Sequence, residues 1–202
     1  MSKIEVNEIV NQTGDNDSGI DLTTNDQIGF KIANASKWTL NSSGNLFPAS
    51  TSQGIVLGAT SDASANRLDD YEEGTWTPTV IGNGGNSGQA YSSQQGTYTK
   101  TGRQVDCRFY LVLSTEGSFS GSYLRLSGFP FTISTAVQTV HLCNLYFVGL
   151  GVNYISLGLQ AYENTTSAFI WGKTGATTSR EYLGTSHLAD DANLSGSFTY
   201  FV

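Results

Sequence analysis

The sequence predicts an all-β protein, and three observations support this fold class. Ser, Thr, Asn and Gly account for 84 of the 202 residues, and all four favour turns or extended backbone over helix. Apolar and polar residues alternate along several stretches, most clearly at 105–113, and no segment keeps a helical period. Glycine-rich connections separate the predicted strands by roughly 8 to 15 residues, a spacing typical of a β-sandwich, which we expect to be jelly-roll-like.

Residues 1–50 are predicted to form an extended region of short strands. Candidate strands lie at 4–10, 19–22, 30–32 and 38–40, and clusters of Asn, Asp, Ser and Gly between them favour turns. The region has too few apolar residues for a core of its own. We therefore expect it to gain burial from further copies of itself in a homo-oligomer.

Residues 51–75 are predicted to be a linker with one short apolar strand at 55–57, ending in an acidic junction. Four of the 17 acidic residues fall within five positions, at 69, 70, 72 and 73. The segment 75–80 that follows is rich in Thr and contains Pro78, which an edge strand tolerates better than a central one. We expect an acidic turn that leads into an edge strand.

The acidic junction has three interpretations. It is a solvated loop, a contact between subunits with Tyr71 and Trp76 as apolar anchors and Arg67 as counter-charge, or a site for a metal or for catalysis. Neighbouring carboxylates on an extended chain point to opposite sides, and the run lacks the alternating ligands of a calcium loop, so the third interpretation is the least favoured. The expected junction residues are Leu68, Asp69, Asp70, Tyr71, Glu72, Glu73 and Trp76.

Residues 76–202 are predicted to form the β-sandwich. A loop is expected at 82–95, followed by a hairpin in which 96–99 and 105–113 pair across a turn at 100–103. Pro130 cannot donate to a strand ladder and is expected to end the strand before it. Further strands are predicted at 123–126, 137–150, 154–161, 168–171, 180–183 and 197–202.

Several segments of the sequence resemble parts of tailed-bacteriophage fibre proteins. The sequence LDDYEEGTWTPTV at 68–80, followed by GTYTKTGRQV at 96–105, resembles the junction and first hairpin of that family. LSGFPFT at 126–132 and SGSFTY at 195–200 resemble segments of the fibre heads, and KIEVNEIVNQTG at 3–14 resembles the N-terminal regions more loosely.

The resemblance implies a viral structural protein of the virion, built as an intertwined homotrimer. Its N-terminal region would attach to other virion proteins, and its C-terminal head would bind a glycan or another receptor on the host surface during adsorption. The chain is short for a tail fibre and shows no long shaft, so a capsid- or neck-attached fibre or adaptor with a purely structural role is the alternative. A polysaccharide-degrading spike is a second alternative, from a different functional class.

Aromatic residues in or beside predicted loops are candidates for receptor contact, because aromatic rings stack on sugars next to amide and hydroxyl groups. Packing in the core or at a subunit interface is the more frequent role for each of them. The candidates are Tyr91, Phe119, Tyr162, Trp171 and Tyr182.

Composition argues against several other classes of function. The net charge is −7 and no basic patch occurs, so nucleic acid is not expected as a partner. No apolar run approaches the roughly 18 residues of a membrane helix, so we expect no membrane insertion. The N-terminus lacks a secretory pattern, so we expect the protein to assemble in the host cytoplasm.

No cofactor, metal ion or catalytic activity is expected from the motifs. Cys107 and Cys143 are expected to be buried free thiols, with a disulfide as the alternative, and they show no CxxC spacing. His141 and His187 have no partner at metal or triad spacing. Neither a GxSxG elbow nor a phosphate-binding GxxxxGK[ST] loop occurs.

Overall fold

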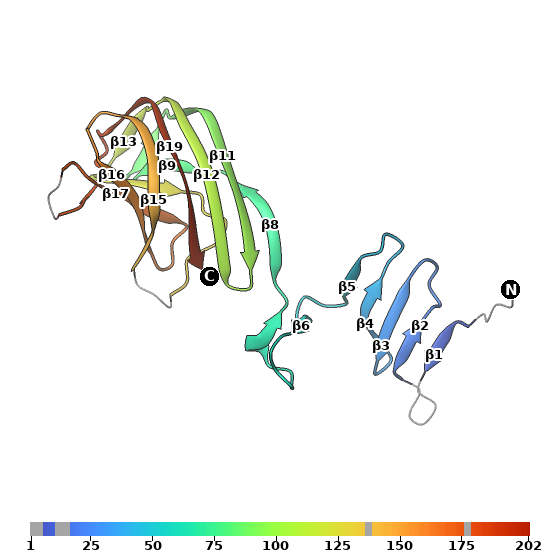
Figure 1. Cartoon of the computed structure of the whole chain (residues 1–202). Coiled ribbons are helices and arrows are strands. Elements are labelled where there is room, and N and C mark those ends of the chain that lie inside the picture. The colour runs from blue at the N-terminus through green and yellow to red at the C-terminus, as the bar shows by residue number, and fades with distance from the viewer. Residues whose placement is uncertain (1–5, 11–16, 136–138, 176–178) are drawn as a thin grey trace. The chain divides into compact units, whose positions relative to one another are not determined.

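The computed structural model describes residues 6–10, 17–135, 139–175 and 179–202, and within them the protein is all-β apart from one 3₁₀ turn, η1 (Ser64–Asn66) (Figure 1). The predicted all-β class is therefore confirmed. The chain divides into two compact units, Met1–Asp70 and Tyr71–Val202. We call them the N-terminal unit and the head unit.

The N-terminal unit contains a five-stranded antiparallel sheet in which each strand pairs with the next one along the chain. Turns formed by polar residues limit the length of these strands; for example, the Asn41 side chain accepts hydrogen bonds from the backbone N–H groups of Ser43 and Asn45. A two-stranded hairpin, β6 (Ile55–Val56) and β7 (Arg67–Leu68), completes the unit. The strands of the sheet are β1 (Glu8–Val10), β2 (Gly19–Asp21), β3 (Ile28–Ile32), β4 (Ala35–Leu40) and β5 (Leu46–Pro48).

The head unit is built on a ten-stranded antiparallel sheet with the order β8-β11-β12-β19-β15-β16-β17-β14-β9, in which β18 pairs with β17. A separate pair is formed by β10 and β13. The bounds are β8 (Tyr71–Trp76), β9 (Thr79–Gly82), β10 (Gly85–Ser87), β11 (Ala90–Thr101), β12 (Gln104–Thr115), β13 (Ser118–Ser120), β14 (Leu124–Ser127), β15 (Thr139–Leu150), β16 (Ser156–Tyr162), β17 (Ser167–Lys173), β18 (Glu181–Tyr182) and β19 (Leu188–Phe201).

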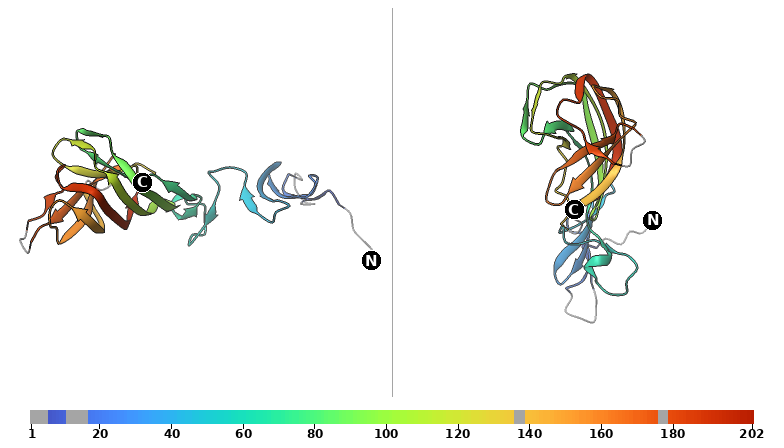
Figure 2. Two further views of the ribbon diagram at one scale, coloured as in Figure 1. Left: turned by 90° about the horizontal axis from the view of Figure 1, so that it is seen from above. Right: turned by 90° about the vertical axis from the view of Figure 1, so that its left-hand side faces the viewer.

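The sheet of the head unit curls back on itself, as the views in Figure 2 show. Strand β15 belongs to both halves of the curl, because it pairs with β16 through Thr139–Leu145 and with β19 through Tyr146–Leu150. Strands β8 and β9 end the sheet on opposite sides, yet only Thr77 and Pro78 separate them in the chain. Pro78 fits this crossing because it has no N–H to offer a ladder.

A close backbone contact lies beside this crossing. Gly128 has a φ of 92°, and a Cβ there would lie 2.3 Å from the Thr77 carbonyl oxygen. Only glycine accommodates both the conformation and the contact. This glycine belongs to the 126–132 segment that resembles the fibre heads.

The apolar core of the described chain lies wholly in the head unit. Inward-facing residues alternate along β12, where Val105, Cys107, Phe109, Leu111 and Leu113 are all buried. They meet buried residues from the opposite half of the curl, such as those of β14, β16 and β17. This core resembles that of a β-sandwich, in which most strands present one face to the interior, although β16 is buried on both faces.

Several sequence predictions need correction. The hairpin at 96–113 is confirmed, but the loop expected at 82–95 is largely strand, because β11 begins at Ala90 and matches the full length of β12. The prediction of an acidic turn is wrong for residues 71–73, since these residues begin β8 and pair with β11. The last strand begins at Leu188, well before the predicted residue 197. Parts of the strands predicted at 4–10 and 137–150 lie outside the described residues.

Candidate functional site

The sheet of the N-terminal unit has one face made of apolar side chains. Residues directly opposite each other in an antiparallel sheet lie on the same face, and the register aligns one apolar residue from each of the five strands in a single row. Residues two positions along the strands extend the patch on the same face. This N-terminal apolar face consists of Ile9, Ile20, Ile28, Phe30, Trp38, Leu40, Leu46 and Pro48.

The other face of this sheet is mainly polar. It carries Glu8, Asp21 and Lys31, and the Lys31 ammonium donates a hydrogen bond to the Glu8 carboxylate in an ion pair. None of the residues described in the N-terminal unit is a buried apolar one. The unit is thus one amphipathic layer whose apolar face has no core beneath it, and a monomeric protein rarely leaves such a patch uncovered.

The expected junction residues are divided between the two units. Leu68, Asp69 and Asp70 belong to the N-terminal unit. Arg67 forms an ion pair with Asp62 at 2.5 Å and lies 3.9 Å from Asp69. The expected counter-charge therefore has partners within its own unit.

Glu72 and Glu73 lie on opposite faces of β8. Glu72 accepts a hydrogen bond from the Tyr98 hydroxyl, and Glu73 accepts one from the Tyr71 hydroxyl. Each hydrogen bond raises the pKa of the tyrosine that donates it. The two carboxylates therefore do not converge on a common ligand.

Trp76 lies in the core of the head unit. Its side chain is only 7% exposed, its ring packs against Phe109, Phe129 and Phe198 at centroid distances of 5.8 to 6.1 Å, and its Nε1 donates to the Thr97 carbonyl at 3.2 Å. The apolar contact expected of Trp76 between subunits is therefore made within one chain. Tyr71, by contrast, is exposed.

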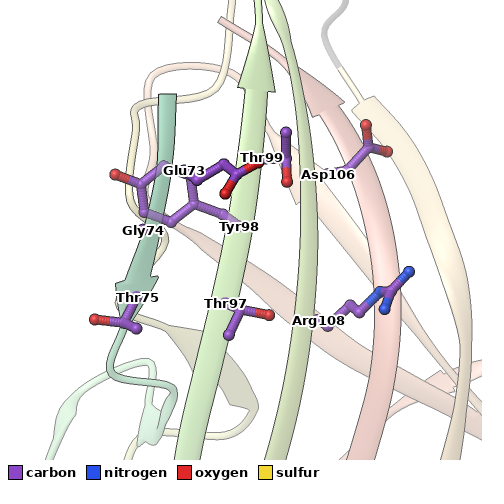
Figure 3. A pocket seen from close by; sticks show the side chains of 8 residues that line it. All are labelled: Glu73, Gly74, Thr75, Thr97, Tyr98, Thr99, Asp106 and Arg108. Atoms are coloured by element: carbon purple, nitrogen blue, oxygen red, sulfur yellow. The ribbon is translucent and has the colours of Figure 1, made fainter. Parts of the chain in front are cut away.

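A shallow depression of about 530 Å³ lies on the outer face of β8, β11 and β12 (Figure 3). Three threonine hydroxyls, two carboxylates and one guanidinium surround it, so a polar ligand fits it better than an apolar one. A second depression of about 220 Å³ adjoins it and shares Thr97 and Arg108. The first is lined by Glu73, Gly74, Thr75, Thr97, Tyr98, Thr99, Asp106 and Arg108.

The charged groups in this depression differ in how they are held. Asp106 accepts hydrogen bonds from the Thr199 hydroxyl and, at 2.9 Å, from the Gln104 amide, and these bonds lower its pKa. Arg108 takes part in none of the ion pairs among the described residues. Both carboxylates of the depression, Glu73 and Asp106, thus already accept hydrogen bonds, whereas the Arg108 guanidinium has no ion-pair partner among the described residues.

Two of the five predicted receptor contacts lie apart from the others. The Tyr91 ring packs against the core, and its hydroxyl accepts a hydrogen bond from the Val80 N–H at 3.0 Å. Burial raises the pKa of this hydroxyl. Phe119 is partly buried against the same core from β13. Both residues contribute to packing in the structure.

The other three predicted contacts lie together on the outer face of the opposite half of the curl. Tyr162, Trp171 and Tyr182 come from β16, β17 and β18, and Phe169 lies between Tyr162 and Tyr182 at centroid distances of 5.5 and 5.0 Å. Tyr123 adds a further ring, and Arg125 and Arg180 place cations over rings of the group. We call this group the aromatic patch: Tyr123, Arg125, Tyr162, Phe169, Trp171, Arg180 and Tyr182.

A buried amide fixes the tyrosines of this patch. Gln160 is 3% exposed, and its Nε2 donates to the Tyr162 hydroxyl at 3.1 Å. The hydroxyls of Tyr162 and Tyr182 lie 2.9 Å apart, and Tyr182 donates to Gln160 Oε1 at 3.4 Å. Because the buried amide bonds to these two hydroxyls and to no other side chain of the described residues, the rings have little freedom to reorient.

Sequence reasoning did not propose Tyr123, Arg125 or Phe169 for this patch. A usable signal was present, since Tyr123 and Arg125 alternate with Leu124 and Leu126, which are fully buried. Alternation therefore places Tyr123 and Arg125 together on the outer face. The pairing of Arg125 with Phe169 depends on the register of β14 and β17, which the sequence does not reveal.

The cysteines and histidines are the remaining residues that sequence analysis considered for chemistry. Cys107 is buried, Cys143 is half-buried, and both are free thiols. A hydrogen bond of 2.7 Å joins His187 Nδ1 and the Tyr154 hydroxyl. The side chain of His141 lies outside the described residues. Within the described part of the chain, no three His, Cys, Asp or Glu side chains are placed to hold a metal ion, and no helix is long and apolar enough to cross a membrane.

The sequence matches no family model and no curated protein.

Proposed function

We propose that this protein is a short, trimeric fibre of a tailed-bacteriophage virion that binds a glycan receptor on the host surface. The observation that carries the proposal is the N-terminal apolar face, on a unit with no core of its own. The proposal also rests on the junction and hairpin sequences at 68–80 and 96–105, which resemble those of phage fibres.

The N-terminal apolar face favours self-association over a separate existence. A single sheet with one apolar face gains little stability unless a second layer covers that face. Copies of the same chain provide such a layer in equal number, and a closed arrangement about a symmetry axis leaves no copy uncovered. The sequence resemblance supports three copies. The mainly polar opposite face would then lie outward, available to other virion proteins.

The head unit has the properties that a receptor-binding module needs. It has an apolar core of its own, so the hydrophobic burial that stabilises the fold does not depend on its outer faces. Those faces carry threonine and serine hydroxyls, the carboxylate and guanidinium of Asp106 and Arg108, and the aromatic patch. Hydroxyl, amide and aromatic groups on a rigid scaffold suit sugar binding. In the proposed fibre the head is jelly-roll-like and points outward.

Light scattering on the full-length protein tests the assembly. Multi-angle scattering after size exclusion should give about 65 kDa, three times the chain mass of 21.6 kDa. A monomer at micromolar concentration would argue against any fibre. Immunogold labelling of virions that carry the protein should then place it at the tail, the neck or the capsid.

A separate assay distinguishes adsorption from degradation. The labelled full-length protein should adhere to host cells and release no reducing ends from their capsular polysaccharide. Release of reducing ends would favour the polysaccharide-degrading spike. Adhesion at background level, with a trimer on virions, would favour a purely structural fibre.

A further inference from the structure

Arg125 in the aromatic patch is a cation held over an aromatic ring, with no ion-pair partner among the described residues. Its guanidinium lies over the Phe169 ring, with Cζ 4.2 Å from the ring centroid. Its Nε is buried and makes no hydrogen bond, and none of the ion pairs among the described residues includes Arg125. A ligand cannot reach the buried Nε, but the Nη groups are not among the buried unpartnered atoms, so they can donate hydrogen bonds to a ligand.

The neighbours of Arg125 make this position attractive for an anion. On the sheet its direct neighbours are Ile81 and Phe169, neither of which can accept a hydrogen bond through its side chain. Arg180, over the Trp171 ring, adds a second positive charge to the same patch. The net charge of the chain is −7, so these two cations contrast with the overall charge of the protein.

The aromatic rings beside Arg125 provide a second kind of contact. Tyr123 is 41% exposed and lies just before β14, two residues from Arg125, so the alternation of side chains places both on the same side. Its ring centroid is 5.1 Å from that of Tyr182 and 6.3 Å from that of Phe169, so it stands at the edge of a fixed aromatic cluster. An exposed ring held in this way stacks on the apolar face of a sugar with little loss of side-chain entropy.

We propose that Arg125 and Tyr123 form a subsite for an acidic sugar, in which the guanidinium binds the carboxylate and the Tyr123 ring stacks on the sugar ring. The planar guanidinium matches a carboxylate in a two-pronged arrangement. A simple anion would use only Arg125 and a neutral sugar only Tyr123, whereas a uronic acid uses both. This assignment rests on the proposed function and names the class of receptor.

Ligand titration of the full-length protein tests the subsite. The ligands are methyl glucuronoside, methyl glucoside and acetate, followed by NMR through the Nε–H signals of the arginines and by isothermal titration calorimetry. We expect methyl glucuronoside to shift the Arg125 signal and to bind more tightly than either of the other two. Equal binding of methyl glucoside or of acetate, or no binding of the glucuronoside, would overturn the assignment.

Variants with a matched control identify the residues. Arg125→Gln and Tyr123→Ser should each weaken glucuronoside binding by roughly tenfold or more. Arg103→Gln is the control, because Arg103 is an exposed arginine in the turn between β11 and β12 and takes part in none of the ion pairs among the described residues, so it should leave binding unchanged. Equal losses in the Arg125 and Arg103 variants would show a non-specific charge effect and would contradict the proposal. Tyr123→Ser alters only a partly exposed ring, so it reports on binding even if the Arg125 variant folds poorly.

The subsite and the proposed function can be disproved independently of each other. If the protein is trimeric and adheres to host cells, but the Arg125→Gln variant adheres equally well, the subsite is wrong while the fibre function stands. If the protein is a monomer that nevertheless binds glucuronoside through Arg125, the subsite stands and the fibre function is wrong.

Discussion

The hydroxyl of Tyr200 forms two hydrogen bonds with the backbone of Phe131, accepting one from its N–H and donating one to its carbonyl, each at 3.1 Å. Phe131 follows Pro130 and lies outside any strand, so the tyrosine hydroxyl takes the place of a ladder partner. Burial raises the pKa of this hydroxyl, which keeps it protonated and able to donate at neutral pH.

Replacing Tyr200 by Phe should destabilise the head unit by about 1 to 3 kcal/mol, because both backbone groups of Phe131 lose their partner in a partly buried place. Urea unfolding followed by circular dichroism measures the change. Tyr110→Phe is a suitable control, since Tyr110 is exposed and only accepts a 3.3 Å hydrogen bond from Asn193. Equal stability of the Tyr200 variant and the parent would contradict the role of the hydroxyl.

Truncation of Trp76 should be far more damaging than neutralisation of the nearby acids. Trp76→Ala removes a ring that contacts three buried aromatic rings and should cost about 3 to 5 kcal/mol. Glu72→Gln with Glu73→Gln should leave the melting temperature unchanged or slightly higher, because these carboxylates lie at the surface. Thermal melting at low and high salt compares the two. Collapse of the Gln variant alone would show that the acidic run binds a metal or a partner.

A matched pair of phenylalanines tests the N-terminal apolar face. Phe30 and Phe47 are 41% and 44% exposed, but the strand register places Phe30 on the apolar face and Phe47 on the polar one. Phe30→Glu should dissociate the assembly, since a charge buried between subunits is costly. Phe47→Glu should have little effect. Light scattering decides the outcome, and equal effects of the two substitutions would mean that the apolar face is not the contact surface.

The two cysteines should react slowly with thiol reagents in the native protein. Burial raises the pKa of Cys107 to about 12 and that of Cys143 to about 11, so almost no thiolate is present at neutral pH. Iodoacetamide at pH 8 should label Cys143, which is half-buried, faster than Cys107, and both only after long exposure. Unfolding in guanidinium should make both react at once. Rapid native labelling of Cys107 would contradict the strand register of β12.

Asp106 should make part of the stability depend on acid pH. Its pKa is lowered by the hydrogen bonds from Thr199 and Gln104, so it contributes stability above its unfolded pKa of roughly 3.9, and this contribution is lost as the pH falls through the folded pKa. The difference in stability between the parent and Asp106→Asn should therefore shrink from pH 7 to pH 2. Urea unfolding at both pH values measures it, and a constant difference would show that the hydrogen bonds do not favour the charged form.

The all-β class and the central hairpin could be predicted from the sequence, because alternation at 105–113 is a local property that the structure retains in β12. Which face a residue occupies was harder to predict. From Ser93 to Thr101, odd-numbered residues of β11 face outward, and the same alternation would place Tyr91 there. A register irregularity between Tyr91 and Ser93 turns Tyr91 towards the core instead.

The candidate site was less predictable because it depends on contacts between distant strands. Tyr162, Trp171 and Tyr182 were candidates individually, but their grouping with Phe169 and Arg125 requires the register of four strands. The N-terminal apolar face was hard to predict for the same reason. Its short strands seemed merely poor in apolar residues, and only the pairing of Phe30 with Ile20 and Trp38 shows that those few residues share one side.

The position of β19 in the middle of the sheet has a consequence for synthesis. This strand pairs on one side with β12, where Tyr200 is opposite Val105, and on the other side with β15. A nascent chain that has not yet released residues 188–201 from the ribosome holds β12 and β15 with bare edges and an open interior. Pairing across such long sequence separations slows folding, and until it is complete the unpaired strand edges are exposed and prone to aggregation. The head unit should therefore complete its fold only after translation has passed this strand.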